Sequence, residues 1–161
     1  ASGYVRLEKP GVVALVDCAA IGPDYLPGHA HADTLSFELS LGEERVIVNG
    51  GTSVYGTGTD RLRQRSTAAH STVEIDGQNS SEVWGGFRVA RRARVTEVKT
   101  KVQPEFEVVA SHDGYRRLQG RNMHSRTFRL DEGRFEIADA VSGPYRSAIA
   151  RFHLAPGASL D

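Results

Sequence analysis

Alternation of apolar and polar side chains at every second residue is the feature that most constrains how this chain can fold. It is clearest over residues 35–41, where Leu35, Phe37, Leu39 and Leu41 fall on one face of an extended strand. Similar strand-like runs cover residues 45–49, 72–75, 106–110, 126–130, 134–141 and 148–154. Turn residues such as Asp-Gly pairs separate the runs, and only residues 60–65 suggest a helical turn. The pattern predicts an all-β fold, an antiparallel β-sandwich or a stack of sheets.

Length and composition predict a single domain over residues 1–161 and exclude several classes of partner. The 20 Lys and Arg residues balance 20 Asp and Glu residues, which disfavours a nucleic-acid partner. No apolar run approaches the roughly 18 residues of a membrane span, so none is expected. The single cysteine, Cys18, has no internal disulfide partner, and its strand-like surroundings predict a small buried apolar side chain.

Three polar side chains alternate in the segment His29-Ala30-His31-Ala32-Asp33. In an extended chain they project to the same face, and imidazole and carboxylate groups are good zinc ligands. A surface loop with incidental histidines is the simpler alternative. His70 directly precedes a predicted strand, a position that suits a metal ligand or a structural hydrogen bond equally well. The remaining histidines are expected to be structural: His112, His124 and His153.

A long glycine-rich loop over residues 50–69 presents Tyr55. It does not resemble a phosphate-binding loop, because no Lys-Ser/Thr pair follows and no helix is predicted to begin there. Further on, Arg88, Arg92 and Arg94 share one face if their segment is a regular strand, and Trp84 lies nearby. Guanidinium groups beside an aromatic ring suit an acidic sugar chain, although a solvated strand face explains the pattern equally well. Arg88, Arg92 and Trp84 are therefore the predicted substrate-binding residues.

Taken in order, these segments resemble the C-terminal β-domain of the heparinase II/III family, which includes related alginate lyases. The resemblance covers residues 29–94 and continues more loosely over residues 111–118. Its most specific parts are residues 28–37, 51–55, 65–73 and 84–87. It implies that the chain is a fragment of a larger protein, in which an N-terminal α/α toroid precedes stacked antiparallel sheets. The substrate then lies in a cleft between the two parts.

The resemblance also implies an activity and a set of site residues. The activity is that of a polysaccharide lyase, which cleaves a uronic-acid-containing polysaccharide by β-elimination. His29 and Tyr55 take catalytic positions, while His31 and His70 match the ligands of a structural zinc ion. Asn49 stands where the family has an Asp as third ligand, and a neutral amide weakens the expected zinc binding. The principal Tyr acid/base belongs to the toroid, and the expected location is periplasmic or secreted, with any export signal upstream of the fragment.

Two other functions are compatible with the sequence. One is a non-catalytic carbohydrate-binding or structural β-sandwich module, which is all that the fragment by itself can be. The other is a cupin-type metalloenzyme, since His-x-His is followed by Glu38 and Gly42. The interval from His31 to Glu38 is too long for the cupin pattern, and no second histidine motif follows.

Overall fold

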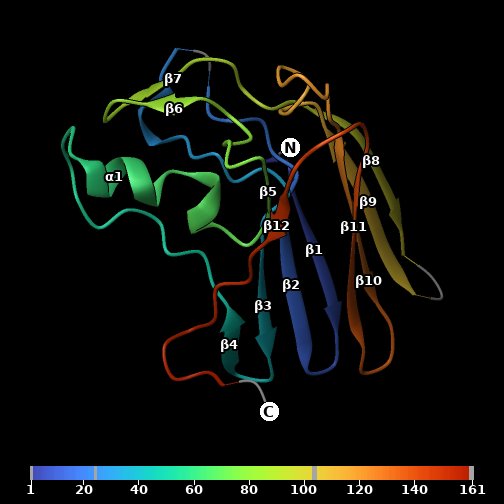
Figure 1. Cartoon of the computed structure of the whole chain (residues 1–161). Helices are drawn as coiled ribbons and strands as arrows, with labels where there is room; N and C mark the ends of the chain where they lie inside the picture. Colours follow the sequence, from blue (N-terminus) through green and yellow to red (C-terminus); the bar gives the residue numbers. More distant parts are fainter. Residues whose placement is uncertain (1, 24, 103–104, 160–161) are drawn as a thin grey trace.

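Two four-stranded antiparallel sheets form most of the structure (Figure 1), which confirms the all-β antiparallel fold that the sequence predicts. The computed structural model describes residues 2–23, 25–102 and 105–159. The first sheet has the strand order β1 (Tyr4–Lys9), β2 (Val12–Asp17), β3 (Phe37–Leu41) and β4 (Glu44–Ile47). The second has the order β11 (Phe135–Val141), β10 (His124–Leu130), β9 (Phe106–His112) and β8 (Val95–Lys101). Neighbouring strands are consecutive in sequence, and only the connection from β2 to β3 is long.

The two large sheets pack face to face through their apolar sides. Phe37 on β3 lies at the centre, with its ring centroid 5.6 Å from that of Phe128, 5.8 Å from Phe135 and 6.1 Å from Phe152. The buried core is Leu7, Ala14, Val16, Cys18, Leu35, Phe37, Ile47, Val108, Ala110, Phe128 and Leu130. Because both sheets contribute, neither can bury its apolar face without the other. The burial of Cys18 confirms its predicted role as a small core residue.

The remaining elements lie above and to one side of the two large sheets (Figure 1). They are α1 (Thr59–Gln64), the 3-10 turns η1 (Pro27–His29) and η2 (Thr67–Ala69), and the strand pairs β5 (Val73–Ile75) with β12 (Ala148–Ala150) and β6 (Val83–Trp84) with β7 (Arg88–Val89). The short helix α1 agrees with the turn predicted over residues 60–65. None of the helices in the described ranges is long and apolar enough to cross a membrane.

Two predicted strands are shorter than the sequence pattern suggests. The run predicted over residues 148–154 is regular only in β12, and Leu154 makes an isolated bridge to Ile47. The run predicted over residues 88–94 ends at Val89, because the following backbone makes irregular bonds: Ala90 N–H donates to the Glu82 carbonyl and Ala93 N–H to the Ser81 hydroxyl. Arg88, Arg92 and Arg94 therefore do not share the face of a regular strand.

Candidate functional site

His31 and His70 come together at one end of the sandwich, as their spacing and the family resemblance predict. His31 Nδ1 lies 3.2 Å from His70 Nε2, and the two ring centroids are 5.1 Å apart. Asp33 completes the group, since one ligand atom from each of the three residues lies within 4.8 Å of the others. His70 is buried, while His31 and Asp33 are half-buried. The cluster thus joins the segment before β3 to the segment before β5.

Hydrogen bonds between the two segments hold the cluster together. Ala32 N–H donates to the Arg65 carbonyl at 2.9 Å, and the Thr67 hydroxyl donates to the Ala32 carbonyl at 2.8 Å. The Thr72 hydroxyl donates to the Thr34 carbonyl at 2.9 Å. These hydrogen bonds lie on both sides of the cluster in sequence, so the protein itself holds the two imidazoles in position without a bound metal ion.

Asn49 contacts the opposite edge of the His70 ring. Its side-chain oxygen lies 3.0 Å from His70 Nδ1, and an amide oxygen can only accept a hydrogen bond, so Nδ1 carries the proton. The lone pair is then on Nε2, which faces His31. One ion cannot occupy both edges of a ring. In this arrangement Asn49 orients the His70 ring, and Asp33 is the acidic member of the cluster. The ligand position that the resemblance implies for Asn49 stays a prediction.

The donor set and its spacing fit a divalent metal ion such as zinc. Two ligands of a tetrahedral zinc, with bonds of about 2.0–2.1 Å, lie about 3.3 Å apart, close to the 3.2 Å between His31 Nδ1 and His70 Nε2. Burial lowers the pKa of both imidazoles to about 4, so both are neutral at pH 7, the form that binds metal. Burial raises the pKa of Asp33, while the neighbouring His31 acts to lower it.

A hollow of about 180 Å³ opens beside the cluster, with Asp17, His29, His31 and Asp33 in its lining. Asp17 ends β2 and is only 7% exposed. Burial, helped by the charge of Asp33, raises its pKa to about 7, although a hydrogen bond from Ala19 N–H opposes the shift. Two buried carboxyl groups whose pKa values are both raised favour a cation nearby, which agrees with a metal at the cluster.

His29 lies outside the cluster and is exposed. The segment was expected to be extended, with His29, His31 and Asp33 on one face, but the 3-10 turn η1 ends at His29 and breaks the alternation. His29 instead neighbours Tyr55, whose side chain is 76% exposed, with ring centroids 6.1 Å apart. Tyr55 in turn lies 6.0 Å from the Phe87 ring. The two predicted catalytic residues therefore form an exposed pair beside the cluster of His31, Asp33 and His70.

Arg61, which the sequence analysis did not single out, lies buried beneath this exposed pair. Its guanidinium carbon is 5.1 Å from the Tyr55 ring centroid and 4.5 Å from that of Phe87. It donates to the carbonyls of Gly28 at 2.9 Å and Gly86 at 2.6 Å. The arginine thus fixes the backbone that carries His29 and the loop that carries Tyr55.

Arg65 is a second buried arginine of this region. It donates to the carbonyls of Ala30 at 2.9 Å and Gly86 at 2.8 Å. Within residues 2–23, 25–102 and 105–159, neither Arg61 nor Arg65 forms an ion pair with a carboxylate. Carbonyl groups satisfy the donors but do not neutralise the charge, so two buried cations place a positive field under the exposed surface.

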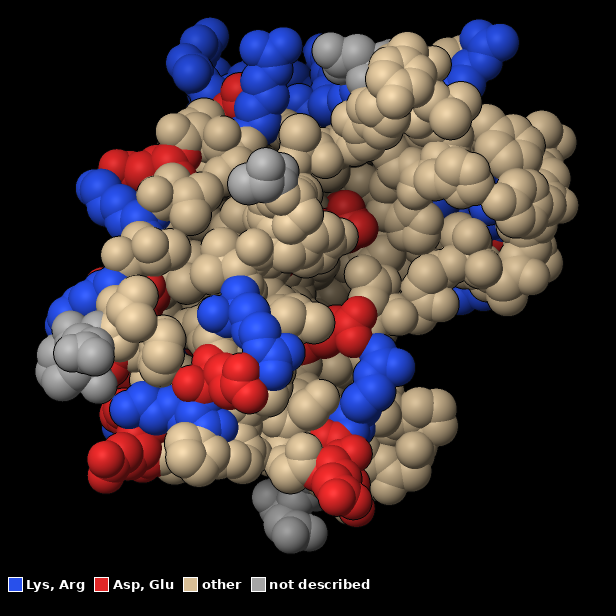
Figure 2. Space-filling model, turned by 180° about the vertical axis from the view of Figure 1, so that it is seen from behind, with Lys and Arg blue, Asp and Glu red and all other residues tan. Residues whose placement is uncertain are grey.

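The three predicted substrate-binding residues occupy different surroundings. Trp84 is 49% exposed, and the Arg88 guanidinium lies 4.9 Å from the centroid of its ring. Arg92 donates to the carbonyls of Ile21 and Pro23 at 3.3 and 3.4 Å, which ties it to the loop after β2. On the face drawn in Figure 2, Lys and Arg gather along the upper edge, while acidic and basic residues mix over the lower part. Of the three predicted substrate-binding residues, Trp84 and Arg88 form an aromatic–cation pair at the surface.

The fold and the cluster define a β-sandwich domain with a candidate metal centre and an exposed His–Tyr pair. The family model described as "Heparinase II/III-like, C-terminal" matches residues 1–161, and the chain belongs to this family. A comparison of the sequence with curated proteins gives no match.

Solved structures show the same fold. A crystal structure of heparinase III superimposes with a TM-score of 0.71 at 20% identity, covering 96% of this chain and 23% of that one. The heparan sulfate lyase HepC from Pedobacter heparinus gives a TM-score of 0.65 at 20% identity, covering 88% of this chain and 21% of that one. The chain thus spans less than a quarter of the length of either lyase.

We expect Asn49→Asp to increase zinc affinity about 10- to 100-fold, because a carboxylate on His70 Nδ1 makes the ring a stronger ligand than an amide does. Isothermal titration of the metal-free protein with zinc measures the change. His70→Ala is the matched loss control and should abolish binding at this site. Unchanged affinity in Asn49→Asp would show that Asn49 does not act on the metal site.

The raised pKa of Asp17 predicts a pH-dependent stability difference. The folded state holds the Asp17 proton up to about pH 7, against an ordinary value of 3.8. The associated stabilisation is complete below the ordinary value and is lost as the pH rises through 7. Asp17→Asn, which cannot ionise, should therefore be more stable than the native chain at pH 8, by up to about 4 kcal/mol, and the difference should shrink toward pH 4.

Urea unfolding with a metal chelator present, at several pH values, tests this expectation. Glu43→Gln, in the exposed turn after β3, is the control and should show no such trend. A native chain as stable as Asp17→Asn at pH 8 would contradict the raised pKa of the buried Asp17.

Proposed function

We propose that this chain is the β-domain of a polysaccharide lyase, a carbon–oxygen lyase that cleaves uronic-acid-containing polysaccharide by β-elimination. The observation that carries the proposal is the exposed pair of His29 and Tyr55 above the buried Arg61, in a chain of the heparinase II/III-like C-terminal family. Two solved structures with this fold are titled heparinase III and heparan sulfate lyase. The exposed pair then forms one wall of the substrate cleft.

The charge of this surface suits an acidic sugar chain. Arg61 and Arg65 are almost fully buried, so they do not contact the substrate directly. Their uncompensated charges act through the Tyr55 and Phe87 rings and the backbone, where the low dielectric constant strengthens the field. A uronate carboxylate or a sulfate group approaching His29 is attracted, while a neutral polysaccharide gains nothing from this field.

The chemical difficulty of the reaction is the weak acidity of the C5 proton of a uronate. A base takes this proton, the electron pair forms a C4–C5 double bond, and O4 leaves with a proton from an acid. Negative charge develops on the uronate carboxylate, so a hydrogen-bond donor placed there lowers the barrier. We assign this charge-neutralising role to His29, and Tyr55 contacts the sugar beside it. Both side chains are exposed and can reach a bound chain.

The metal cluster is proposed to be structural. His31, Asp33 and His70 would hold a zinc ion, which supplies a cross-link between two loops of the cleft wall. His31 lies two residues from His29 in sequence, so fixing His31 also limits the movement of His29. No step of the elimination requires the ion.

The rest of the active site is proposed to come from an N-terminal α/α toroid of the same protein, which supplies the principal Tyr acid/base. General acid–base catalysis requires groups within hydrogen-bond reach of the proton, and His29 and Tyr55 occupy only one side. An acidic polysaccharide is an extracellular or periplasmic substrate, so we place the protein in the periplasm or outside the cell.

A non-catalytic carbohydrate-binding module is the second candidate, and the stacked pair of Trp84 and Arg88 favours it. An exposed indole ring can stack on a sugar, and the adjacent guanidinium can pair with an acidic group. The cupin alternative receives no support, because Glu38 pairs with Arg45 at 2.5 Å on the sheet surface, away from the histidines.

The two candidates differ in which variant affects turnover. In the full-length protein, His29→Ala should lower kcat about 100-fold or more, because it removes a group that acts in the transition state. Trp84→Ala should mainly raise KM. Ultraviolet absorbance of the unsaturated uronate product, with heparan sulfate and alginate as test polysaccharides, measures both parameters.

Two controls complete the assay. Leu41→Ala changes an exposed side chain on β3 and should leave kcat and KM unchanged. The isolated domain should give no turnover, because it lacks the opposite wall. Full activity of His29→Ala would refute the assignment of His29, and turnover by the isolated domain would refute the two-wall arrangement. Polysaccharide binding without product from the full-length protein would favour the binding module.

A further inference from the structure

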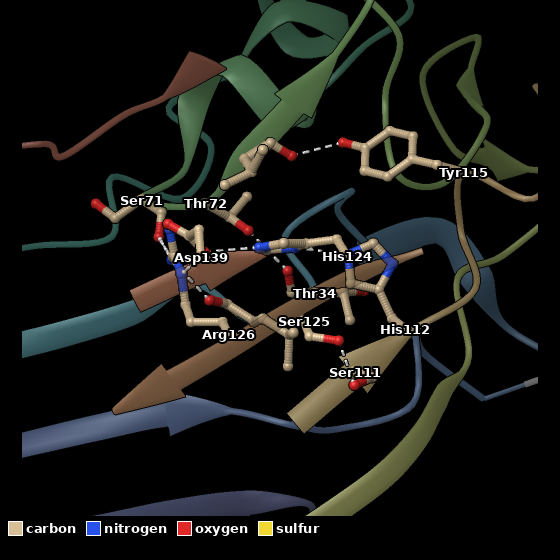
Figure 3. A network of polar contacts seen from close by, with 12 residues as sticks. Thr34, Ser71, Thr72, Ser111, His112, Tyr115, His124, Ser125, Arg126 and Asp139 are labelled. Carbon is tan, nitrogen blue, oxygen red and sulfur yellow. Dashed lines mark hydrogen bonds and ion pairs between the residues drawn. The ribbon is translucent and has the colours of Figure 1, made fainter. Parts of the chain in front are cut away.

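A buried arginine in the second large sheet reaches the two segments that carry the metal cluster. Arg126 lies on β10 and is fully buried. Its Nη1 donates to the carbonyl of Leu35 at 3.0 Å and to that of Ser71 at 2.7 Å. Leu35 lies two residues after Asp33, and Ser71 directly follows His70. One nitrogen atom thus bridges the two segments. Figure 3 shows Arg126 between Ser71 and Asp139.

The charge of Arg126 is neutralised within its own sheet. Asp139, its register partner on β11, accepts from Nε at 2.7 Å and from Nη2 at 2.9 Å. Burial acts to raise the pKa of Asp139, but hydrogen bonds from His124 and Arg126 and the charge of Arg126 lower it overall. The fork-to-fork geometry fixes the guanidinium plane, so the direction of Nη1 is fixed as well.

A pair of buried histidines also holds Asp139 in place. His124 Nε2 donates to Asp139 Oδ1 at 2.7 Å, and His112 Nε2 donates to His124 Nδ1 at 3.1 Å (Figure 3). His112 Nδ1 accepts from Gly114 N–H, which leaves its proton on Nε2. Burial lowers the pKa of both imidazoles, so both are neutral. Each ring nitrogen of His112 and His124 then has a single role, as hydrogen-bond donor or as acceptor.

The segment held by Arg126 has a backbone that needs outside support. Leu35 has a φ of 61°, a left-handed conformation that is unfavourable for a residue with a side chain. Its N–H donates to the Asp17 carbonyl at 2.9 Å, and its carbonyl accepts from Arg126. Leu35 follows Asp33 by two residues, so holding this strained residue also limits the movement of Asp33.

We propose that Arg126, neutralised by Asp139, is a positioning residue that sets the distance between the His31–Asp33 segment and His70. Of the two measurements below, only cobalt binding rests on the proposed metal site; hydrogen exchange does not. Arg126 touches neither a ligand atom nor the substrate, and acts through the carbonyls of Leu35 and Ser71.

The test compares Arg126→Met and Arg126→Lys with two control variants on the same strand. Leu130→Ala removes a buried core side chain that takes no part in the bridge, and Arg129→Met removes a partly exposed ion pair with Glu107. Cobalt(II) is the spectroscopic probe of the site, titrated at a temperature where every variant is folded. Amide hydrogen exchange of residues 33–36 and 70–72 is followed without metal.

We expect Arg126→Met to weaken cobalt binding about tenfold or more and to speed exchange in both segments together. Arg126→Lys keeps the charge near Asp139 but lacks the planar fork, so it should fall between Arg126→Met and the native chain, and it stands in for Arg126→Met if that variant does not fold. Leu130→Ala should lower the melting temperature without changing cobalt affinity, and Arg129→Met should change neither.

Two results would overturn the proposal. One is cobalt affinity in the Arg126 variants equal to that of Leu130→Ala. The other is unchanged exchange in residues 33–36 and 70–72. If the native chain binds no cobalt, the proposed metal site fails, and the exchange measurement alone decides whether Arg126 positions the two segments.

Discussion

The contact between the apolar faces of the two large sheets is the interaction on which the rest of the structure depends. Phe37 from the first sheet packs among rings that include Phe128 and Phe135 of the second. Stacking the sheets brings one set of strand ends together: the end of β2 with Asp17, the start of β10 with Arg126, and the end of β11 with Asp139. The segments before β3 and β5 are hydrogen-bonded to each other at this end, and the cluster of His31, Asp33 and His70 forms between them.

Buried charge has two different forms in this domain. Arg126 is paired with a carboxylate, and its remaining donors hold the backbone near the cluster. Arg61 and Arg65 donate to carbonyl groups and, for Arg61, to the Thr52 hydroxyl, and neither pairs with a carboxylate among the described residues, so their charge remains available to attract an anion. An unpaired buried charge is costly to folding. The proposed binding of an acidic polysaccharide explains why the domain keeps two buried charges that lower its stability.

The sequence was sufficient for the fold class and for several strands, although not for β1 or β8, and the family resemblance predicted the partnership of His31 with His70. Alternation with turn residues identified β3, β9, β10 and β11, because each has one buried face. The alternation failed for residues 88–94. Their backbone is hydrogen-bonded to residues 81 and 82 and does not continue as a regular strand after Val89. It also misplaced His29, since nothing in the residue pattern revealed the 3-10 turn before it.

The buried arginines were beyond prediction for another reason. Arg61 lies in the short polar helix α1, Arg65 directly follows it, and Arg126 lies on an alternating strand, where charged residues are normally exposed. Their burial depends on carbonyls up to 91 positions away in the chain, as between Arg126 and Leu35. A single sequence does not display such pairings; the partnership of His31 with His70, 39 positions apart, was predicted only through the family resemblance.

The central claim is that the sandwich preassembles His31, Asp33 and His70 into a metal site beside His29. Anomalous diffraction at the zinc absorption edge, from crystals of the domain grown with zinc, tests it most directly. The account predicts a peak about 2.0–2.1 Å from His31 Nδ1 and His70 Nε2, with an Asp33 oxygen as a further ligand. No peak at the cluster, or a zinc ion bound elsewhere while these imidazoles bond only to each other and to Asn49, would contradict it.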